Sequence, residues 1–124
     1  MDAPTRKVVL IVDDAAVART LLRAILVKGD YDVVEADSGA NAIRSFHSLR
    51  PDIVTMDLLM DSMNGLVAIQ AIKTIDPDAR IIVISSTTEP NIVQQAIKLG
   101  VKAFVAKPFQ PGILLGAVEK ALSA

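Results

Sequence analysis

Short, uninterrupted apolar runs alternate along the chain with longer stretches in which apolar residues recur at helical spacing. The short runs are rich in β-branched residues, which is typical of parallel strands buried on both faces. The second run differs, because its mixed polarity indicates a position nearer the edge of a sheet. The strands are expected at residues 7–12, 32–36, 51–57, 80–84 and 103–106.

The intervening stretches have the 3.6-residue period of amphipathic helices. Asp37 or Ser38 supplies an N-terminal cap for the second helix, and Pro90 and Pro111 suit the first turn of the last two. Gly29 is expected to end the first helix in the left-handed conformation. The helices are expected at residues 15–28, 38–48, 66–76, 90–99 and 111–122. Their apolar sides are expected to include Val17, Leu21, Leu49 and Ile97.

Strands that alternate with helices in this way restrict the topology. Parallel neighbours need crossover connections, and such crossovers are right-handed. No linker, low-complexity segment or repeat divides the chain. We therefore expect an α/β fold in which a five-stranded, doubly wound parallel sheet with five helices forms a single domain over residues 1–124.

Composition and charge exclude several kinds of partner surface and of metal site. A net charge of −1 argues against a broad nucleic-acid or membrane surface. The absence of cysteine excludes thiolate chemistry and disulfides, and His47, the only histidine, cannot form a histidine cluster. No apolar run has the length of a signal peptide or a membrane span. The expectation is a soluble, cytoplasmic protein without membrane insertion, whose metal ligands are oxygen atoms.

Polar residues follow the apolar runs where the predicted strands end. Asp13 and Asp14 close the first run, Asp57 the third, Ser85 the fourth and Lys107 the fifth. The carboxyl ends of parallel strands share one edge of the sheet, where ligands bind. Converging carboxylates repel one another, and Mg²⁺ is the simplest cation to neutralise them. The pattern predicts phosphoryl transfer, with Asp57 as the nucleophile.

In order and spacing, Val12-Asp13-Asp14, Asp57, Ser85 and Lys107-Pro108-Phe109 resemble a receiver domain of two-component response regulators. The resemblance covers essentially the whole chain and is strongest to single-domain CheY-type regulators. It implies a flavodoxin-like sheet with strand order 2-1-3-4-5. The segments around Asp13 and Pro111 also resemble the chemotaxis-associated subset.

The resemblance implies a role for each matched residue. Asp57 would accept a phosphoryl group from a sensor histidine kinase. Asp14, Asp57 and the backbone carbonyl of Leu59 would bind Mg²⁺, and Asp13 would help through water. Lys107 would pair with the phosphorylated Asp57.

Other implied features concern the switch and its surface. Ser85 would be the switch hydroxyl, and Phe104 the aromatic whose rotamer reports the state. The peptide before Pro108 would be cis. A downstream protein target would bind the face built from the fourth helix, last strand and last helix.

Two features near the phosphoacceptor set this chain apart. Asp61 stands where the family usually has proline, which leaves the loop less constrained and adds a fourth acid near the site. Leu59 and Thr87 occupy the variable positions that tune the lifetime of the aspartyl phosphate in this family. Because Leu59 has no group to orient an attacking water, we predict slow self-dephosphorylation.

Simpler interpretations exist for several of these residues. Asp13 and Asp14 could only cap the following helix. The hydroxyls after Ser85 could be turn and capping residues, and Phe104 could be only a core residue. His47 is expected on a solvated helix face, and Asp61 to be a loop acid.

Other protein classes also remain open. The chain could be a receiver fragment of a longer regulator with an output domain. A haloacid-dehalogenase-like phosphohydrolase also uses an aspartyl phosphate, but it needs a second acid at the position of Leu59. A phosphorylation-independent interaction module is the third alternative.

Overall fold

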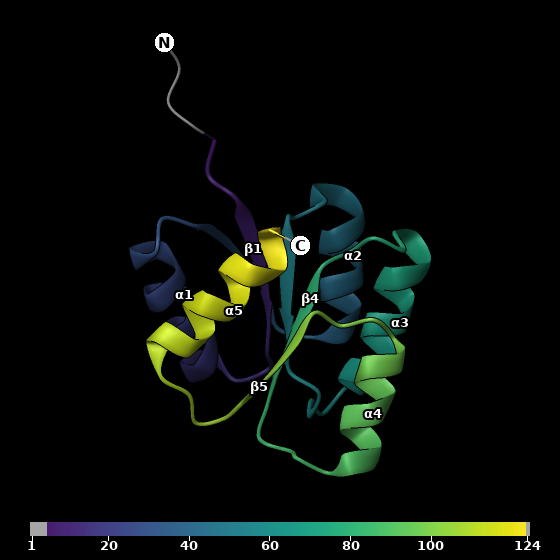
Figure 1. Ribbon diagram of the computed structural model, residues 1–124. Helices are drawn as coiled ribbons and strands as arrows, with labels where there is room; N and C mark the ends of the chain where they lie inside the picture. Colours follow the sequence, from purple (N-terminus) through teal and green to yellow (C-terminus); the bar gives the residue numbers. More distant parts are fainter. Residues whose placement is uncertain (1–4, 124) are drawn as a thin grey trace.

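The computed structural model describes residues 5–123 and has a central sheet covered by helices on both faces (Figure 1). All neighbouring strands are parallel, and their order is β2-β1-β3-β4-β5. The predicted α/β class and strand order are therefore confirmed, as is the edge position of β2. The strands are β1 (Val8–Val12), β2 (Asp32–Ala36), β3 (Ile53–Met56), β4 (Ile81–Ser85) and β5 (Ala103–Ala106).

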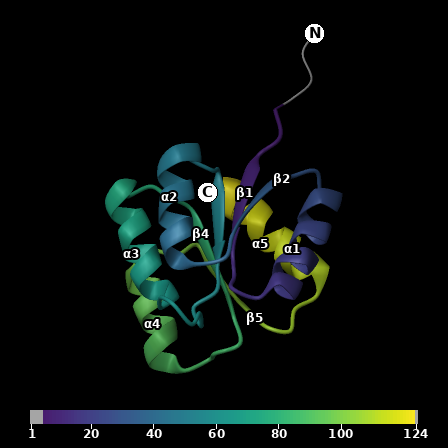
Figure 2. The same cartoon turned by 180° about the vertical axis from the view of Figure 1, so that it is seen from behind.

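Helices follow every strand, and most of their boundaries lie within a residue or two of the predicted ones. Helices α1 and α5 cover one face of the sheet, while α2, α3 and α4 cover the other, as the two opposite views show (Figures 1 and 2). The helices are α1 (Ala16–Lys28), α2 (Gly39–Leu49), α3 (Gly65–Ile75), α4 (Pro90–Lys98) and α5 (Pro111–Ser123).

Alternation along the strands divides the core into two layers. In β1, Leu10 and Val12 belong to the layer under α2 and α3, whereas Val9 and Ile11 belong to the layer under α1 and α5. Successive strand side chains point to opposite faces, so a strand buried on both faces must be apolar at every position. This explains why the central strands have uninterrupted apolar sequences.

Local signals at the helix ends are only partly as predicted. The Ser38 hydroxyl accepts a hydrogen bond from the Asn41 N–H at 3.1 Å and caps α2. The prediction of a left-handed Gly29 is wrong, because its φ is −85°. Asp30, with φ of 70°, makes the turn in its place, which aspartate tolerates better than most non-glycine residues.

Four apolar side chains assigned to inward faces are exposed, so these predictions are wrong. The exposed fraction is 83% for Val17, 55% for Leu21, 56% for Leu49 and 61% for Ile97. In α1 the fully buried positions are Leu22 and Leu26. A helix that packs on a sheet from one side buries only a narrow stripe, so apolar residues beside that stripe remain in solvent.

No helix among residues 5–123 is both long and apolar enough to span a membrane.

Candidate functional site

The backbone of the sheet brings the first and third strand ends together. Val12 of β1 lies beside Met56 of β3, and the Asp57 N–H donates to the Val12 carbonyl at 3.0 Å. The Asp13 N–H in turn donates to the Ala36 carbonyl at 3.2 Å. The ladder therefore continues one residue past each strand, and it orients Asp13 and Asp57 before any side-chain contact is made.

Three of the predicted acids form one cluster at this edge. Asp13, Asp14 and Asp57 each offer a carboxylate oxygen, and these oxygens lie within 4.8 Å of one another. Asp13 and Asp57 are buried, whereas Asp14 is exposed. Hard carboxylate oxygens with access to water on one side suit Mg²⁺, which keeps several of its waters. The residues present thus fit the expected ion.

Among residues 5–123, Lys107 is the cationic side chain that contacts the carboxylates of this cluster. Its Nζ lies 2.9 Å from Asp13 Oδ2 and 3.6 Å from Asp57 Oδ2. The Lys107 N–H donates to the Ser85 carbonyl at 2.9 Å, so β4 holds the backbone of the lysine. The peptide bond to Pro108 is cis, as the resemblance implied. Lys107 is therefore closer to Asp13 than to Asp57.

Burial opposes the charged forms of Asp57 and Lys107, whereas the attraction between Lys107 and its carboxylate partners favours them. Burial raises the pKa of Asp57 most; the Leu59 N–H and Lys107 counteract it, and the charges of Asp13 and Asp14 add to it. For Lys107, burial opposes the charged form, but the hydrogen bond from its ammonium to Asp13 and the charge of Asp57 together raise its pKa. The site holds more negative charge than one lysine can balance, which favours a bound cation.

The loop after β3 holds Asp57 from the other side. The Leu59 N–H donates to Asp57 Oδ1 at 3.1 Å. The Gly65 N–H donates to the Leu58 carbonyl at 3.0 Å, and a Cβ on Gly65 would overlap the Asp57 carbonyl oxygen. Gly65 has no role in the expectations from the sequence; a glycine at the start of a helix after a strand-end acid was the available signal.

Asp61 also meets the acid cluster, but through its backbone. Its N–H donates to Asp14 Oδ2 at 3.1 Å, a contact that joins residues far apart in the sequence. The Asp61 side chain is not one of the clustered carboxylates. The capping interpretation of Asp13 and Asp14 is wrong, since the N-cap of α1 is Ala15 and has no side-chain cap bond; the Asp13 carboxylate instead accepts from the Ala15 N–H.

The predicted switch residues lie on the neighbouring strands. Ser85 ends β4 and is fully buried, and its hydroxyl accepts from the Thr87 N–H at 3.2 Å. Phe104 of β5 pairs with Val83, two residues before Ser85, and is partly buried against the core layer below α4. Residues two apart share a face of a strand, so Ser85 and Phe104 face the same side of the sheet.

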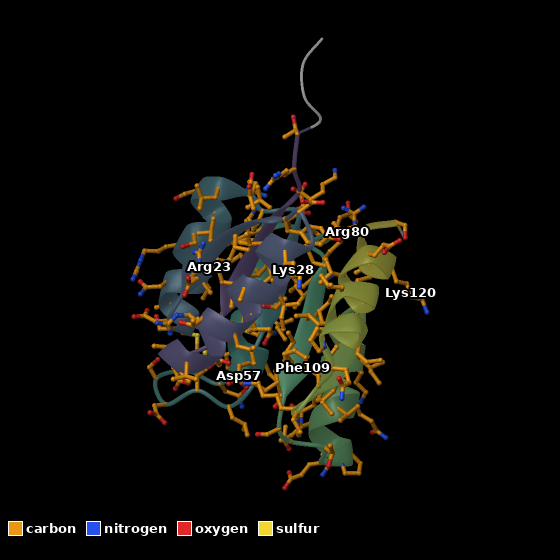
Figure 3. The ribbon with its side chains drawn as sticks, turned by 90° about the vertical axis from the view of Figure 1, so that its left-hand side faces the viewer. Arg23, Lys28, Asp57, Arg80, Phe109 and Lys120 are labelled. Carbon is orange, nitrogen blue, oxygen red and sulfur yellow. The ribbon has the colours of Figure 1, made fainter. Side chains whose placement is uncertain are left out.

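An apolar pocket of about 390 Å³, which was not predicted from the sequence, lies beside Lys107. Figure 3 shows Phe109, which lines it, at the same end of the molecule as Asp57, with Arg80 at the opposite end. The sequence carried no signal for it, because Leu21, one of its walls, was expected on the buried side of its helix. The lining residues are Ala18, Leu21, Leu22, Ser86, Lys107, Pro108 and Phe109.

A doubly wound sheet with clustered acids and a lysine at its carboxyl edge defines the class of protein. The family model described as response regulator receiver domain matches residues 9–119. The chain therefore belongs to the receiver domains of response regulators. Proteins of this family are signalling switches, and they bind Mg²⁺ at an acidic pocket.

Individual relatives place the chain among the CheY-type receivers. It is 49% identical over 115 residues to the chemotaxis protein CheY of Thermotoga maritima, which covers 92% of this chain and 96% of that protein. Identity to CheY of Bacillus subtilis is 45%, covering 93% and 97%. A CheX-CheY-BeF3-Mg²⁺ complex from Borrelia burgdorferi contains a chain of 30% identity and TM-score 0.87, covering 92% of this chain and 87% of that one.

Proposed function

We propose that this chain is a phosphorylation-dependent signalling switch in which Asp57 accepts a phosphoryl group from a sensor histidine kinase. The observation that carries the proposal is the convergence of Asp13, Asp14 and Asp57 within 4.8 Å, with Lys107 against two of them. Buried acids of one sign are costly unless a ligand uses them. Mg²⁺ bound by these carboxylates, together with a phosphoryl group on Asp57, would give all three acids a partner.

Both oxygens of the acceptor are oriented before the reaction. Leu59 N–H holds Asp57 Oδ1, and Lys107 lies on the side of Oδ2. One carboxylate oxygen forms a bond to phosphorus while the bond from phosphorus to the imidazole nitrogen of the donor breaks, and its electron pair stays on nitrogen. Bound Mg²⁺, held by Asp14, Asp57 and the Leu59 carbonyl, with Asp13 acting through water, would neutralise charge on the phosphoryl oxygens.

The new phosphoryl oxygens need hydrogen-bond donors, and Lys107 and Ser85 supply them. The Ser85 hydroxyl accepts from Thr87 N–H, so its own proton is free to donate. When the Ser85 side chain turns toward the phosphoryl group, the loop after β4 would move with it. The partly buried Phe104 would then change rotamer. Complete inversion of a 1:99 population needs about 5.5 kcal/mol, which two charge-assisted hydrogen bonds approach.

The output surface in this proposal is the face formed by α4, β5 and α5. Phe104 belongs to β5, Ser85 ends β4 just before the loop that leads to α4, and Lys107 begins the loop between β5 and α5. CheY of two bacteria is named as a chemotaxis protein, and the solved complex from Borrelia pairs CheY with CheX. By this similarity a kinase of a chemotaxis system is the donor, and a cognate protein is the target. In this proposal residues 1–124 form one receiver domain.

The lifetime of the phosphorylated state depends on the rim of the site. Leu59 is about half exposed and presents an apolar side chain next to the acceptor. Thr87 directs its hydroxyl to the Glu89 N–H at 3.4 Å, within its own turn. The Leu59 side chain has no group to orient an attacking water, which supports slow loss of the phosphoryl group.

Labelling with acetyl phosphate followed by intact-mass spectrometry tests the proposal. The wild-type protein is expected to gain one phosphoryl group in the presence of Mg²⁺ and none with a chelator. Asp57→Asn should gain none, whereas Asp78→Asn, which changes an exposed acid at the other end of the sheet, should behave as wild type. Labelling of Asp57→Asn, or labelling that ignores magnesium, would refute the assignment.

A further inference from the structure

Accepting the proposed function, we propose that the backbone N–H of Asp61 positions Asp14 for magnesium. The role belongs to the peptide N–H and not to the Asp61 carboxylate. Its consequence is that any residue except proline at this position would hold Asp14 in place.

Asp14 is the least restrained acid of the cluster. Asp13 is held by Lys107 and the Ala15 N–H, and Asp57 by Lys107 and the Leu59 N–H. Within the part of the chain that the structure describes, the hydrogen bond from Asp61 N–H is the one bond made by the Asp14 carboxylate. Asp14 is exposed, so without this bond its side chain would be free to rotate in water.

The bond is compatible with metal binding. A carboxylate has about four lone-pair positions, so Asp14 can accept one N–H and still coordinate a cation. The carboxylate oxygens of the cluster lie within 4.8 Å of one another while the bond is present. Ordering a side chain before the ligand arrives removes part of the entropy cost of binding. The bond therefore stabilises the metal-ready arrangement.

Packing at its ends keeps the loop that carries Asp61 in place. Met63 packs so closely on the first turn of α2 that a Cβ on Gly39 would overlap its sulfur. Gly65 lies against the Asp57 carbonyl. Asp61 lies between Leu58, which is buried, and Met63, so the short loop is anchored on both sides of the Asp61 peptide. A peptide held in this way donates with little loss of entropy.

Proline would abolish this interaction, because it has no N–H to donate. The Asp61 carboxylate is a separate contribution: it is exposed, and it attracts a cation only as a screened charge. Two substitutions therefore separate the effects. Asp61→Asn keeps the N–H and removes the charge, whereas Asp61→Pro removes both.

Magnesium titration by isothermal calorimetry, on the unphosphorylated protein, is the decisive measurement. We expect Asp61→Asn to bind with nearly the wild-type dissociation constant, and Asp61→Pro to bind about fivefold more weakly than Asp61→Asn. Circular dichroism and thermal unfolding confirm that both variants are folded. Equal constants for the two variants would overturn the inference while leaving the proposed function intact. No binding by the wild type would instead contradict the proposed function, and this inference with it.

Amide hydrogen exchange in the metal-free protein gives a second, independent readout. The Asp61 N–H is expected to exchange at least tenfold more slowly than the exposed Ser62 N–H, and this protection should vanish in Asp14→Ala. A merely structural loop would keep its protection after that substitution. Unchanged exchange in Asp14→Ala would therefore overturn the inference even if the proline variant bound magnesium weakly.

Discussion

Two acidic groups near the carboxyl end of the sheet differ in how their charge is balanced. Glu35 of β2 lies between two arginines, with Arg19 Nε at 3.0 Å and Arg23 Nε at 2.5 Å from its oxygens. Asp57, with Asp13 and Asp14 beside it, shares the single Lys107. The hydrogen bond from Arg23 lowers the pKa of Glu35, whereas burial raises that of Asp57.

The difference separates an acid that stabilises the fold from one that is reserved for a ligand. Glu35 is ionised at little cost because two guanidinium groups approach it. Asp57 is ionised at a cost, since burial and like charges both oppose it. A ligand site often carries such a cost in the free protein and recovers it on binding. Bound Mg²⁺, pH and a neutral substitution should therefore change the free energy of unfolding in opposite ways through Glu35 and through Asp57.

The largest expected effect is stabilisation by magnesium. At a free concentration 100 times the dissociation constant, Mg²⁺ should raise the free energy of unfolding of the wild type by about 2.7 kcal/mol. Asp57→Asn should lose most of this gain because it removes a proposed ligand. Glu35→Gln should retain it fully. Urea unfolding with and without Mg²⁺ measures both, and an equal loss in Glu35→Gln would remove the distinction between the groups.

In the absence of metal, Asp57→Asn should be more stable than the wild type, by about 1 kcal/mol. The folded pKa of Asp57 is raised, so the wild type loses stability as pH rises from the unfolded to the folded pKa of this group. The difference between the two proteins should therefore be present at neutral pH and disappear in acid. A less stable Asp57→Asn at pH 7 would show that the buried carboxylate stabilises the fold.

Replacing Leu59, at the edge of the Asp57 site, tests how fast the phosphoryl group on Asp57 is lost. Leu59→Asn introduces a polar group that can orient water beside Asp57, so phosphate should be lost about fivefold faster, a barrier lowered by ~1 kcal/mol. Phosphate release from the acetyl phosphate-labelled protein measures the rate. Leu59→Val, which remains apolar, is the matched control. Release from Leu59→Asn no faster than from wild type would contradict the role of Leu59.

The smallest effect is expected at Glu35, whose charge is balanced by two arginines. Glu35→Gln should lower the free energy of unfolding at pH 7 by about 0.5 kcal/mol, since its arginine partners are partly exposed and screened. The folded pKa of Glu35 is lowered, so its contribution is present above the unfolded pKa and is lost as pH falls through the folded value. Thermal unfolding from pH 7 to pH 3 should show the wild type and Glu35→Gln converging in acid.

These opposite pH dependences could not have been predicted from the sequence. Nothing in the sequence around Glu35 indicates that Arg19 and Arg23 of the preceding helix, α1, approach it. Asp57 differs from an ordinary acid at a strand end only by its burial. The charge balance of each group depends on how α1 packs beside β2 and how Lys107 returns beside β1. Both follow from long-range packing.

The sequence by itself determined the elements and the edge at which chemistry takes place. Uninterrupted apolar runs must lie inside a sheet covered on both faces, and parallel strands must present Asp13, Asp57 and Lys107 at one edge. Tertiary structure decided the remainder: Lys107 nearer Asp13, Gly65 against the Asp57 carbonyl, and the N–H of Asp61 on Asp14. Hydrophobic periodicity specifies which face of an element is buried, but contacts between residues far apart in the chain depend on how whole elements pack.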